Sequence, residues 1–244
     1  MGEEFESGSV WLVGAGPGDP ELLTRKAERL VRSATVVFHD ALVSTGVLDL
    51  VPSHVRLESV GKRAGRHSID QASIDKLLVQ AALTGEKVVR LKGGDPAIFA
   101  RSGEEVAACR AAGIIVRICP GTTAASAPAA SLEMSLTLRG LARKLVFVTA
   151  HSQAAEPLTL DWSSLTGPDT TLAVYMGKTA ADEVVRRLIV AGLPGTTPVA
   201  LVENVSLPEE RQILTRLSRL PLAMRTITLS GPAIILVGEA VGQG

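Results

Sequence analysis

The sequence predicts an α/β fold made of two domains, and three observations support this prediction. Short apolar runs rich in Val, Leu and Ile alternate with segments of helical periodicity through the first half of the chain. Several of these runs lead directly into loops rich in glycine, proline or threonine. In the second half, the apolar runs lie too close together for every connection to contain a helix. We therefore expect a mostly parallel sheet followed by a mixed sheet with some antiparallel pairing.

Composition agrees with this class and excludes several kinds of site. The 244 residues are 46% hydrophobic but only 3% aromatic, as in proteins with buried parallel strands. The 25 basic and 25 acidic residues give no net charge, which argues against a nucleic-acid partner but leaves room for a local basic pocket. The two cysteines form no Cys-x-x-Cys motif and the four histidines have no ligand spacing, so we expect neither a metal nor a disulfide.

The sequence also indicates where the protein is found. Its first residues, MGEEFESGS, are acidic and lack the apolar segment of a signal peptide. No apolar run approaches the roughly 18 residues that a membrane helix needs. We therefore expect a cytoplasmic protein with no membrane partner.

The expected N-terminal domain covers residues 9–134. Its helices are predicted at 21–32, 44–50 and 70–83, from Ser102 to about 112, and in the alanine-rich stretch after 123. Its expected strands are residues 10–13, 35–38, 55–60, 88–91 and 114–118.

The expected C-terminal domain covers residues 139–244, and the junction falls near 132–138. Helices are predicted over 179–191 and near Leu217. Its expected strands are residues 145–149, 171–175, 199–203, 212–215 and 233–237.

Residues 88–105, VVRLKGGDPAIFARSGEE, form the stretch around which the chain is organised. A buried strand leads into Gly93-Gly94, whose missing Cβ atoms let a ligand lie against the main chain. Pro96 ends the strand pattern, and acidic residues then begin a helix, where the helix dipole favours them. In open α/β sheets, ligands bind beside such strand-to-helix loops at the carboxyl ends of the strands.

Three loops of this kind, at 14–20, 93–96 and 120–123, are expected to meet along one edge of the sheet. The first of them departs from the dinucleotide-binding fingerprint, because Asp19 stands where its third glycine belongs. One such loop is often only a tight turn. The combination of three therefore carries the prediction of a nucleotide-like ligand.

Six motifs then make a resemblance specific. They are GAGPGDPELLT, VGKRAGRH with the following Gln71, VVRLKGGDPAIFARSGEE, PGTTAAS, VYMGK and PVALVEN. In this order they resemble the tetrapyrrole methylases and, within them, the uroporphyrinogen-III C-methyltransferases in their free-standing form. The resemblance covers about residues 9–240, and the GKR stretch is more diagnostic than the glycine loops.

This resemblance implies a fold and a reaction. The fold has two α/β domains with a ligand cleft between them, where S-adenosyl-L-methionine binds in a folded conformation. The reaction moves two methyl groups to C-2 and C-7 of uroporphyrinogen III, giving precorrin-2 for sirohaem and cobalamin biosynthesis and S-adenosyl-L-homocysteine as product. The family works as a homodimer.

The resemblance also assigns roles to residues. Asp40 occupies the position of the proton acceptor, and Lys62 that of the proton donor. Basic side chains suit the carboxylates of the tetrapyrrole substrate, namely Arg63, Arg66, Arg101, Arg139 and the neighbouring Arg143. The residues implied to contact the cofactor are Pro17, Gly93, Gly94, Asp95, Ile98, Thr123, Ala124, Met176 and the backbone at Val205.

Each assignment has a plainer alternative. Asp40 could cap the turn before Ser44, Lys62 and Arg63 could be a solvated pair, and Met176 could belong to the core. One segment departs from the family, since Leu138 replaces its usual histidine. Val205 also stands where the family has glycine, a change that a main-chain contact would survive.

Alternative functions remain open at this point. The chain could be a later precorrin C-methyltransferase, or a cofactor-binding module with weakened catalysis, for which Leu138 argues slightly. An rRNA ribose or diphthamide-pathway methyltransferase is a more distant alternative, and the neutral charge and the GKR stretch speak against it.

Overall fold

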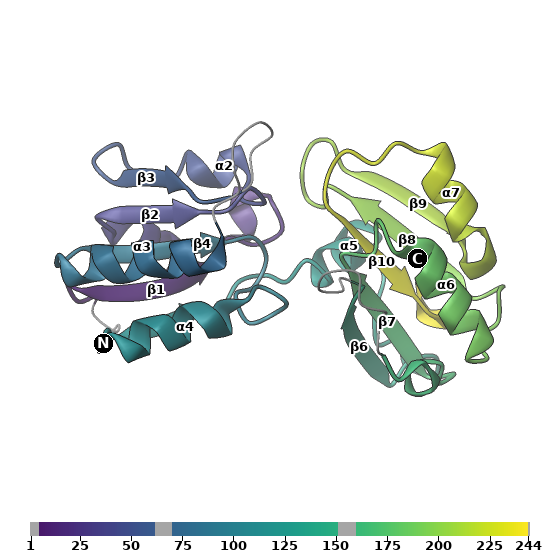
Figure 1. Cartoon of the computed structure of the whole chain (residues 1–244). Helices are drawn as coiled ribbons and strands as arrows, with labels where there is room; N and C mark the ends of the chain where they lie inside the picture. The colour runs from purple at the N-terminus through teal and green to yellow at the C-terminus, as the bar shows by residue number, and fades with distance from the viewer. Residues whose placement is uncertain (1–4, 62–69, 151–159, 244) are drawn as a thin grey trace. The chain divides into compact units, whose positions relative to one another are not determined.

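The chain forms two compact units, Met1–Ala124 and Ala125–Gly244 (Figure 1). The computed structural model describes residues 5–61, 70–150 and 160–243. The division falls after Ala124, earlier than the boundary at 134 expected from the sequence. The reason is that Ala125 and Ala127 pack into clusters made of residues from the second unit.

The N-terminal unit contains a sheet of five parallel strands in the order β3-β2-β4-β1-β5. The expected parallel sheet is therefore confirmed, and all five predicted strands are present. They are β1 (Ser9–Gly14), β2 (Val36–His39), β3 (Arg56–Ser59), β4 (Lys87–Lys92) and β5 (Val116–Cys119).

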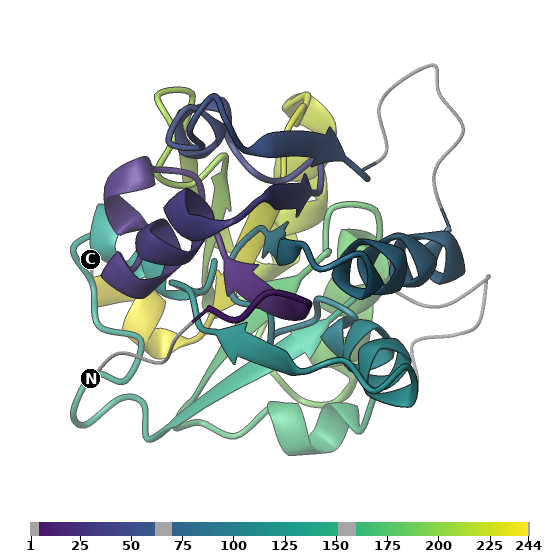
Figure 2. The same ribbon diagram turned by 90° about the vertical axis from the view of Figure 1, so that its left-hand side faces the viewer.

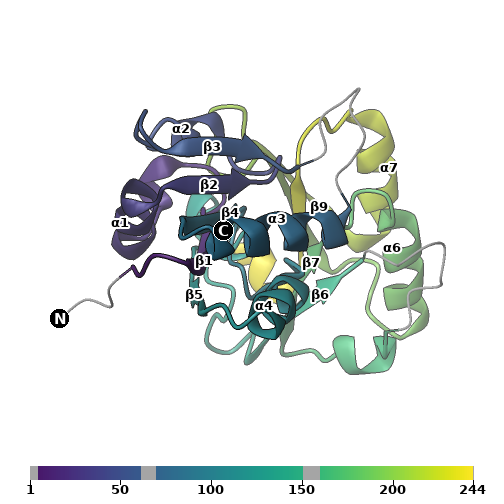
Figure 3. The same cartoon turned by 60° about the vertical axis from the view of Figure 1, so that its left-hand side comes forward.

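Helices cover both faces of this sheet (Figures 2 and 3). On one face, α1 (Arg25–Ser33) and α2 (Thr45–Leu48) pack against Val89 and Leu91 of β4. On the other, α3 (Gln71–Leu83) and α4 (Ser102–Ala111) pack against Val88. Successive side chains of a strand point to opposite faces, so β4 supplies both layers of the core.

The helix predicted over 21–32 is wrong at its start. A 3-10 turn, η1 (Pro20–Leu22), comes first, and α1 begins only at Arg25. The hydroxyl of Thr24 caps the helix by accepting a hydrogen bond from the Ala27 N–H at 3.1 Å. The leucine spacing suggested a longer helix, but this cap sets its first turn.

The C-terminal unit contains a mixed sheet in the order β6-β7-β10-β8-β9. Only β6 and β7 pair in parallel, and the other neighbours are antiparallel, as the closeness of the last strands predicted. The strands are β6 (Lys144–Thr149), β7 (Thr170–Tyr175), β8 (Pro198–Glu203), β9 (Arg211–Arg216) and β10 (Ala233–Val237).

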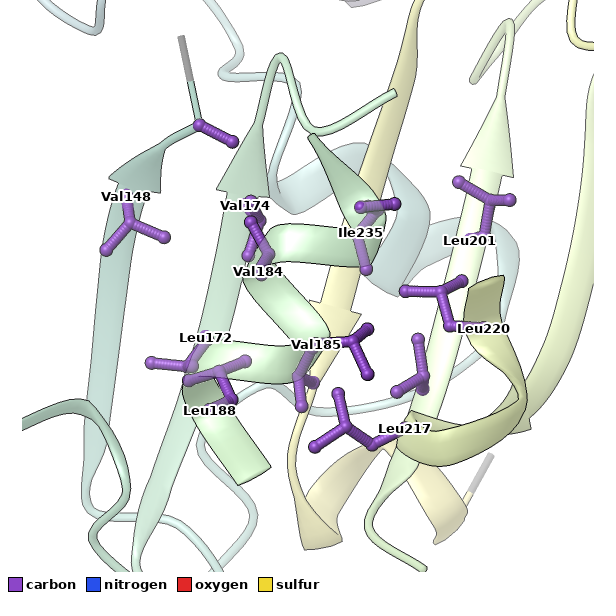
Figure 4. Close-up of a cluster of buried hydrophobic side chains, with 14 of the residues drawn as sticks. Val148, Leu172, Val174, Val184, Val185, Leu188, Leu201, Leu217, Leu220 and Ile235 are labelled. Atoms are coloured by element: carbon purple, nitrogen blue, oxygen red, sulfur yellow. The ribbon is translucent and has the colours of Figure 1, made fainter. Parts of the chain in front are cut away.

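The two faces of this sheet pack into separate clusters. On one face, Leu172 and Val174 belong to a large hydrophobic cluster under α6 (Ala181–Val190), which Figure 4 shows. The turn η3 (Leu217–Arg219) and the helix α7 (Leu220–Thr226) contribute to the same cluster. Ala173 and Ala200 lie on the opposite face with Ala125, at the start of α5 (Ser126–Ser131), and Val241 of η4 (Glu239–Gln243). A further 3-10 turn, η2 (Trp162–Leu165), contributes Leu165 to the large cluster. Ala125 and Ala127 at α5 thus pack against both small and large side chains of this face, including Leu236 and Val202.

The described residues contain neither a metal-binding cluster nor a membrane-spanning helix. Within residues 5–61, 70–150 and 160–243, no group of three or more His, Cys, Asp or Glu side chains is placed to hold a metal ion. None of the helices in this part of the chain is long and apolar enough to cross a membrane.

The packing of the large cluster in the C-terminal unit leads us to expect that a substitution in α6 lowers the stability of the protein. Leu188 is fully buried beneath the helix (Figure 4). Leu188→Ala should lower the free energy of unfolding by about 2–5 kcal/mol, because it removes buried methyl groups and leaves a cavity. Val190→Ala, at a position 76% exposed, should change it by less than about 0.5 kcal/mol. Chemical denaturation measures both, and equal effects would contradict this packing.

Burial of Cys109 predicts an inert thiol. Burial in the cluster under α3 and α4 raises the pKa of Cys109 from 9.0 to about 11. Since the thiolate is the nucleophile, iodoacetamide at about pH 8 should modify native Cys109 at least roughly tenfold more slowly than the denatured chain. The folded state keeps the proton, so this group's contribution to stability is present below pH 9.0 and is lost as the pH rises through about 11. Mass spectrometry measures the labelling, and equal native and denatured rates would refute the assignment.

Candidate functional site

The loops at the carboxyl ends of β1 and β4 are joined directly. Gly94 N–H donates to the Gly16 carbonyl oxygen at 2.7 Å, and Gly16 N–H donates to the Gly94 carbonyl oxygen at 3.2 Å. Both glycines have positive φ, of 71° and 70°, which a residue with a Cβ rarely adopts. The loop after β5 adds a hydrogen bond from the Thr122 hydroxyl to the Leu22 carbonyl at 3.2 Å. The expected meeting of the three glycine loops is therefore confirmed.

Three glycine backbones pack against one another at this edge. A Cβ on Gly14 would lie 2.6 Å from the Cα of Gly121 and 2.7 Å from the Gly94 carbonyl oxygen. A Cβ on Gly121 would collide with the same oxygen. These neighbours are main-chain atoms and cannot rotate away as a side chain can. Glycine is thus needed here for the close approach of three strand ends.

Asp95 holds its own loop with one carboxylate oxygen and links it to the β5 loop with the other. Oδ1 accepts from the Ala97 N–H at 2.7 Å, and Oδ2 accepts from the Gly121 N–H at 3.0 Å. A carboxylate has about four acceptor positions, so each oxygen retains capacity for a ligand. The sequence suggested a ligand contact only, whereas the structure adds a role in holding the β4 and β5 loops together.

The other predicted cofactor residues of the N-terminal unit lie around this junction. A Cβ on Gly94 would lie 3.8 Å from the Ala124 N atom, and one on Gly93 would meet Leu42 at 2.9 Å. Ile98 closes a turn by donating to the Asp95 carbonyl oxygen at 3.1 Å. Pro17, Ile98, Thr123 and Ala124 are each partly exposed.

Asp40 stands at the carboxyl end of β2, beside the same edge. Its Oδ1 accepts from the Leu42 N–H at 2.9 Å, and its side chain is 24% exposed. Ser44, not Asp40, caps α2 by accepting from Val47 N–H at 3.3 Å. Asp40 therefore does cap the turn before Ser44, through the Leu42 N–H. Its second oxygen faces Arg90, whose Nη2 lies 3.8 Å away.

Sequence reasoning missed a buried cluster of charged side chains next to Asp40. Glu105 is fully buried and accepts from Arg90 Nε at 3.0 Å and from Lys92 Nζ at 2.5 Å. Burial lowers the pKa of the Lys92 ammonium, while the Glu105 charge acts in the opposite direction. The sequence did carry a signal for this cluster, because Arg90 and Lys92 stand in a strand expected to be buried. Charged side chains in a buried strand need buried partners of opposite charge.

The C-terminal unit presents a second edge of strand ends. β7 and β8 both run antiparallel to β10, so their carboxyl ends lie on the same side of the sheet. Met176 follows β7 and is 43% exposed, so the interpretation of it as a core residue is wrong. Val205 follows β8 with its side chain buried, which leaves its main chain as the part able to contact a ligand. Tyr175 ties α5 to this edge by accepting from the Ala125 N–H at 3.2 Å.

Unusual backbone geometry gathers at these predicted segments. Among the described residues, positive φ outside glycine occurs at Phe99 and Arg101 after β4, at Met176, at the two neighbours of Val205 and at Glu133. Such conformations are uncommon and are often kept at functional sites. This observation is independent of the motifs and points to the same segments.

The predicted substrate-binding arginines are only partly described. Lys62, Arg63 and Arg66 lie outside the described residues, so their assigned roles stay predictions. Arg101 forms a fork with Glu104, with contacts of 2.8 and 2.7 Å, and this pairing lowers the pKa of the Glu104 carboxyl. Arg139 and Arg143 are exposed in the C-terminal unit. The Leu138 carbonyl oxygen accepts hydrogen bonds from Leu141 and Ala142, so the residue that replaces the family histidine belongs to a turn.

The double acceptor role of Asp95 yields a prediction. In Asp95→Asn one oxygen becomes an amide NH₂ that faces a backbone N–H, so either the bond to Gly121 or the bond to Ala97 is lost. We expect the free energy of unfolding to fall by about 1–3 kcal/mol. Asp70→Asn is the control, because Asp70 caps α3 by accepting from Ser73 N–H and asparagine caps equally well. Denaturant titration compares the variants, and an unchanged Asp95→Asn protein would disprove the linking role.

Known proteins share the sequence of this chain over most of its length. Residues 9–221 match the family described as Tetrapyrrole (Corrin/Porphyrin) Methylases. A uroporphyrinogen-III C-methyltransferase of Paracoccus denitrificans is 48% identical over 236 residues, covering 97% of this chain and 82% of that protein. A siroheme synthase of Gluconacetobacter diazotrophicus is 43% identical over 96% of this chain, which spans only 50% of that protein's length.

Solved structures of methyltransferases share the fold of this chain. The uroporphyrin-III C-methyl transferase of Thermus thermophilus, complexed with S-adenyl homocysteine, superposes with a TM-score of 0.83 at 37% identity, covering 96% of this chain and 99% of that one. A cobalt precorrin-4 methyltransferase gives a TM-score of 0.86 at 28% identity, covering 99% of both chains. Because the sequence match spans most of the chain and both folds agree over nearly their full length, this chain belongs to the tetrapyrrole (corrin/porphyrin) methylase family.

Proposed function

We propose that this protein is an S-adenosyl-L-methionine-dependent methyltransferase that acts on uroporphyrinogen III. It methylates C-2 and C-7 of the macrocycle, giving precorrin-2 and S-adenosyl-L-homocysteine, and so feeds sirohaem and cobalamin biosynthesis. The observation that carries the proposal is the 48% identity to the Paracoccus denitrificans enzyme over 97% of the chain. The glycine edge with Asp40 beside it supports the same conclusion.

The residues of the N-terminal unit fit a nucleoside with a polar end. Gly94 offers open main chain to a ligand, because the nearest atom to a Cβ built there lies 3.8 Å away, whereas Leu42 fills the same space at Gly93. Ile98 and Ala124 are partly exposed apolar neighbours for a flat ring, and Asp95 has spare acceptor capacity. In the C-terminal unit, Met176 and the main chain at Val205 are proposed to contribute further contacts. The proposed cofactor-binding set is thus Pro17, Gly93, Gly94, Asp95, Ile98, Thr123, Ala124, Met176 and Val205.

The chemistry asks little of the protein beyond position and proton management. The bound sulfonium nucleoside supplies a methyl group that is already electrophilic, so no metal is needed to activate it. When a nucleophilic pyrrole carbon takes this methyl, the macrocycle must afterwards lose a proton. Asp40 is proposed to accept it, since one face of its carboxylate is exposed and the other is held by Leu42 N–H. Lys62 is proposed as the proton donor.

The substrate is rich in carboxylates, and guanidinium groups suit them. Arg63, Arg66, Arg101 and Arg139 are proposed for this role. To bind a substrate carboxylate, Arg101 must first break its ion pair with Glu104. Breaking this pair costs little free energy, because the two side chains are 60% and 50% exposed. Arg139 is exposed and free of such a fork among the described contacts.

The alternatives have less support. Similarity to the cobalt precorrin-4 methyltransferase rests on 28% identity, which is well below the 48% shared with the Paracoccus protein. Homodimer formation is carried over from the family resemblance, and a cytoplasmic location from the acidic N-terminal residues and the short apolar runs. They belong to the proposal and rest on no contact described above.

The proposal is tested by incubating the protein with uroporphyrinogen III and methyl-labelled S-adenosylmethionine. Label should enter the macrocycle with the mass and absorbance of a dimethylated product. Asp40→Asn should lower kcat by about 10²–10⁴, the usual contribution of a general base, with little change in the affinity for S-adenosylhomocysteine.

Asp49→Asn is the matched control for this substitution, because Asp49 is an exposed carboxylate at the end of α2 with no assigned role. Its kcat should equal that of the wild type. Binding of S-adenosylhomocysteine without transfer of label would instead identify a cofactor-binding module and reject the enzyme.

A further inference from the structure

The buried charges of Arg90, Lys92 and Glu105 have no role in the proposed function so far. All three are nearly inaccessible to solvent, at 4%, 3% and 0% exposure. Replacing buried ion pairs by apolar residues of similar size often leaves stability unchanged or improves it. Stability alone is therefore a weak reason for three charges to lie inside this unit.

Strand register places this cluster on the same face of the sheet as Asp40. β2 and β4 are parallel neighbours in which Phe38 pairs with Arg90. Phe38 packs in the cluster under α3 and α4. Asp40 is two residues beyond Phe38, and alternation therefore directs it to that face too. Glu105 meets the strand from α4, which covers it.

The Arg90 guanidinium is held on three sides. Nε donates to Glu105 at 3.0 Å, and Nη1 donates to the Leu91 carbonyl oxygen at 3.0 Å. The remaining nitrogen, Nη2, faces Asp40 Oδ2 at 3.8 Å. The fork of an arginine is planar, so fixing two of its nitrogens also fixes the direction of the third.

The charges around Asp40 balance. Arg90 and Lys92 come from β4, Glu105 from α4, and Asp40 itself from the end of β2. The neighbouring His39 ring makes its contact with the Asp40 carbonyl oxygen, at 3.0 Å, rather than with the carboxylate. Two cations thus face two carboxylates among the described residues, and only Asp40 is open to solvent.

We propose that Arg90 is a positioning residue for Asp40, held in place by Glu105 and Lys92. The guanidinium fixes the direction of the Asp40 carboxylate, so that its exposed side stays aimed at the macrocycle from which it takes a proton. The inference rests on the proposed function, because it assumes that Asp40 is the proton acceptor. It extends that function by assigning the work of three residues that touch neither cofactor nor substrate.

The test uses variants of the full chain assayed with uroporphyrinogen III and S-adenosylmethionine. Arg90→Met with Glu105→Gln removes one cation and one carboxylate together, so the buried charge stays balanced. We expect kcat to fall about 100-fold, as for other small misplacements of a reacting group, while KM and the Kd of S-adenosylhomocysteine change less than about twofold. Arg90→Lys keeps the cation without the fork and should give an intermediate kcat.

Two controls separate positioning from general damage. Arg56→Gln removes an arginine from the same sheet with its contacts to Glu58 and Glu86, and kcat should not change. In an Asp40→Asn background, the Arg90→Met and Glu105→Gln pair should cost less than about a further twofold, because a residue acting through Asp40 has nothing left to position.

The outcomes are distinct. A wild-type protein that transfers no label to uroporphyrinogen III rejects the proposed function and this inference with it. An active wild type rejects the inference alone if the paired variant keeps its kcat, if its affinity for S-adenosylhomocysteine falls in parallel, or if its effect multiplies that of Asp40→Asn. Should the paired variant fail to fold, Arg90→Lys in the two backgrounds is judged by the same criteria.

Discussion

The N-terminal unit depends on the contact of three main-chain segments without side chains between them. Gly14, Gly94 and Gly121 end or follow three adjacent strands, and the space for a Cβ at Gly14 or Gly121 is filled by backbone atoms of the other segments. Asp95 of the β4 loop then accepts a hydrogen bond from the Gly121 N–H of the β5 loop. A surface made of main chain is rigid and cannot be covered by its own side chains. This gives the edge of the sheet the properties that a nucleoside site requires.

Buried ion pairs also connect the core of the N-terminal unit to this edge of the sheet. β4 carries Val88 into the layer under α3 and α4, and its next residues on that face are Arg90 and Lys92. Their common partner, Glu105, lies near the start of α4, directly after the loop that presents Gly94 and Asp95. The same strand therefore builds the core, orients the charged cluster and ends at the loop that is proposed to bind the cofactor. A change in its register would alter all three at once.

The C-terminal unit uses different means at its own edge of strand ends. It has no glycine junction of this kind among its described residues. Positive φ angles at Met176, Asn204 and Ser206 turn the chain sharply after β7 and β8 instead. Residues with a Cβ adopt this geometry at a cost, so the surrounding packing must hold it. Tyr175 contributes through its hydroxyl contact to Ala125.

The sequence alone determined the alternation of strands and helices, the mixed character of the second sheet, the meeting of the glycine loops and the family. Most of these follow from local periodicity and from contiguous motifs, and the meeting of the loops needs only that β4, β1 and β5 are neighbours in a parallel sheet. The break between η1 and α1 depended on the Thr24 cap, and the division after Ala124 depended on where α5 packs. Only the tertiary structure paired Arg90 and Lys92 with Glu105 and set Asp40 beside them, because strand order, register and helix placement bring together residues that no local pattern connects.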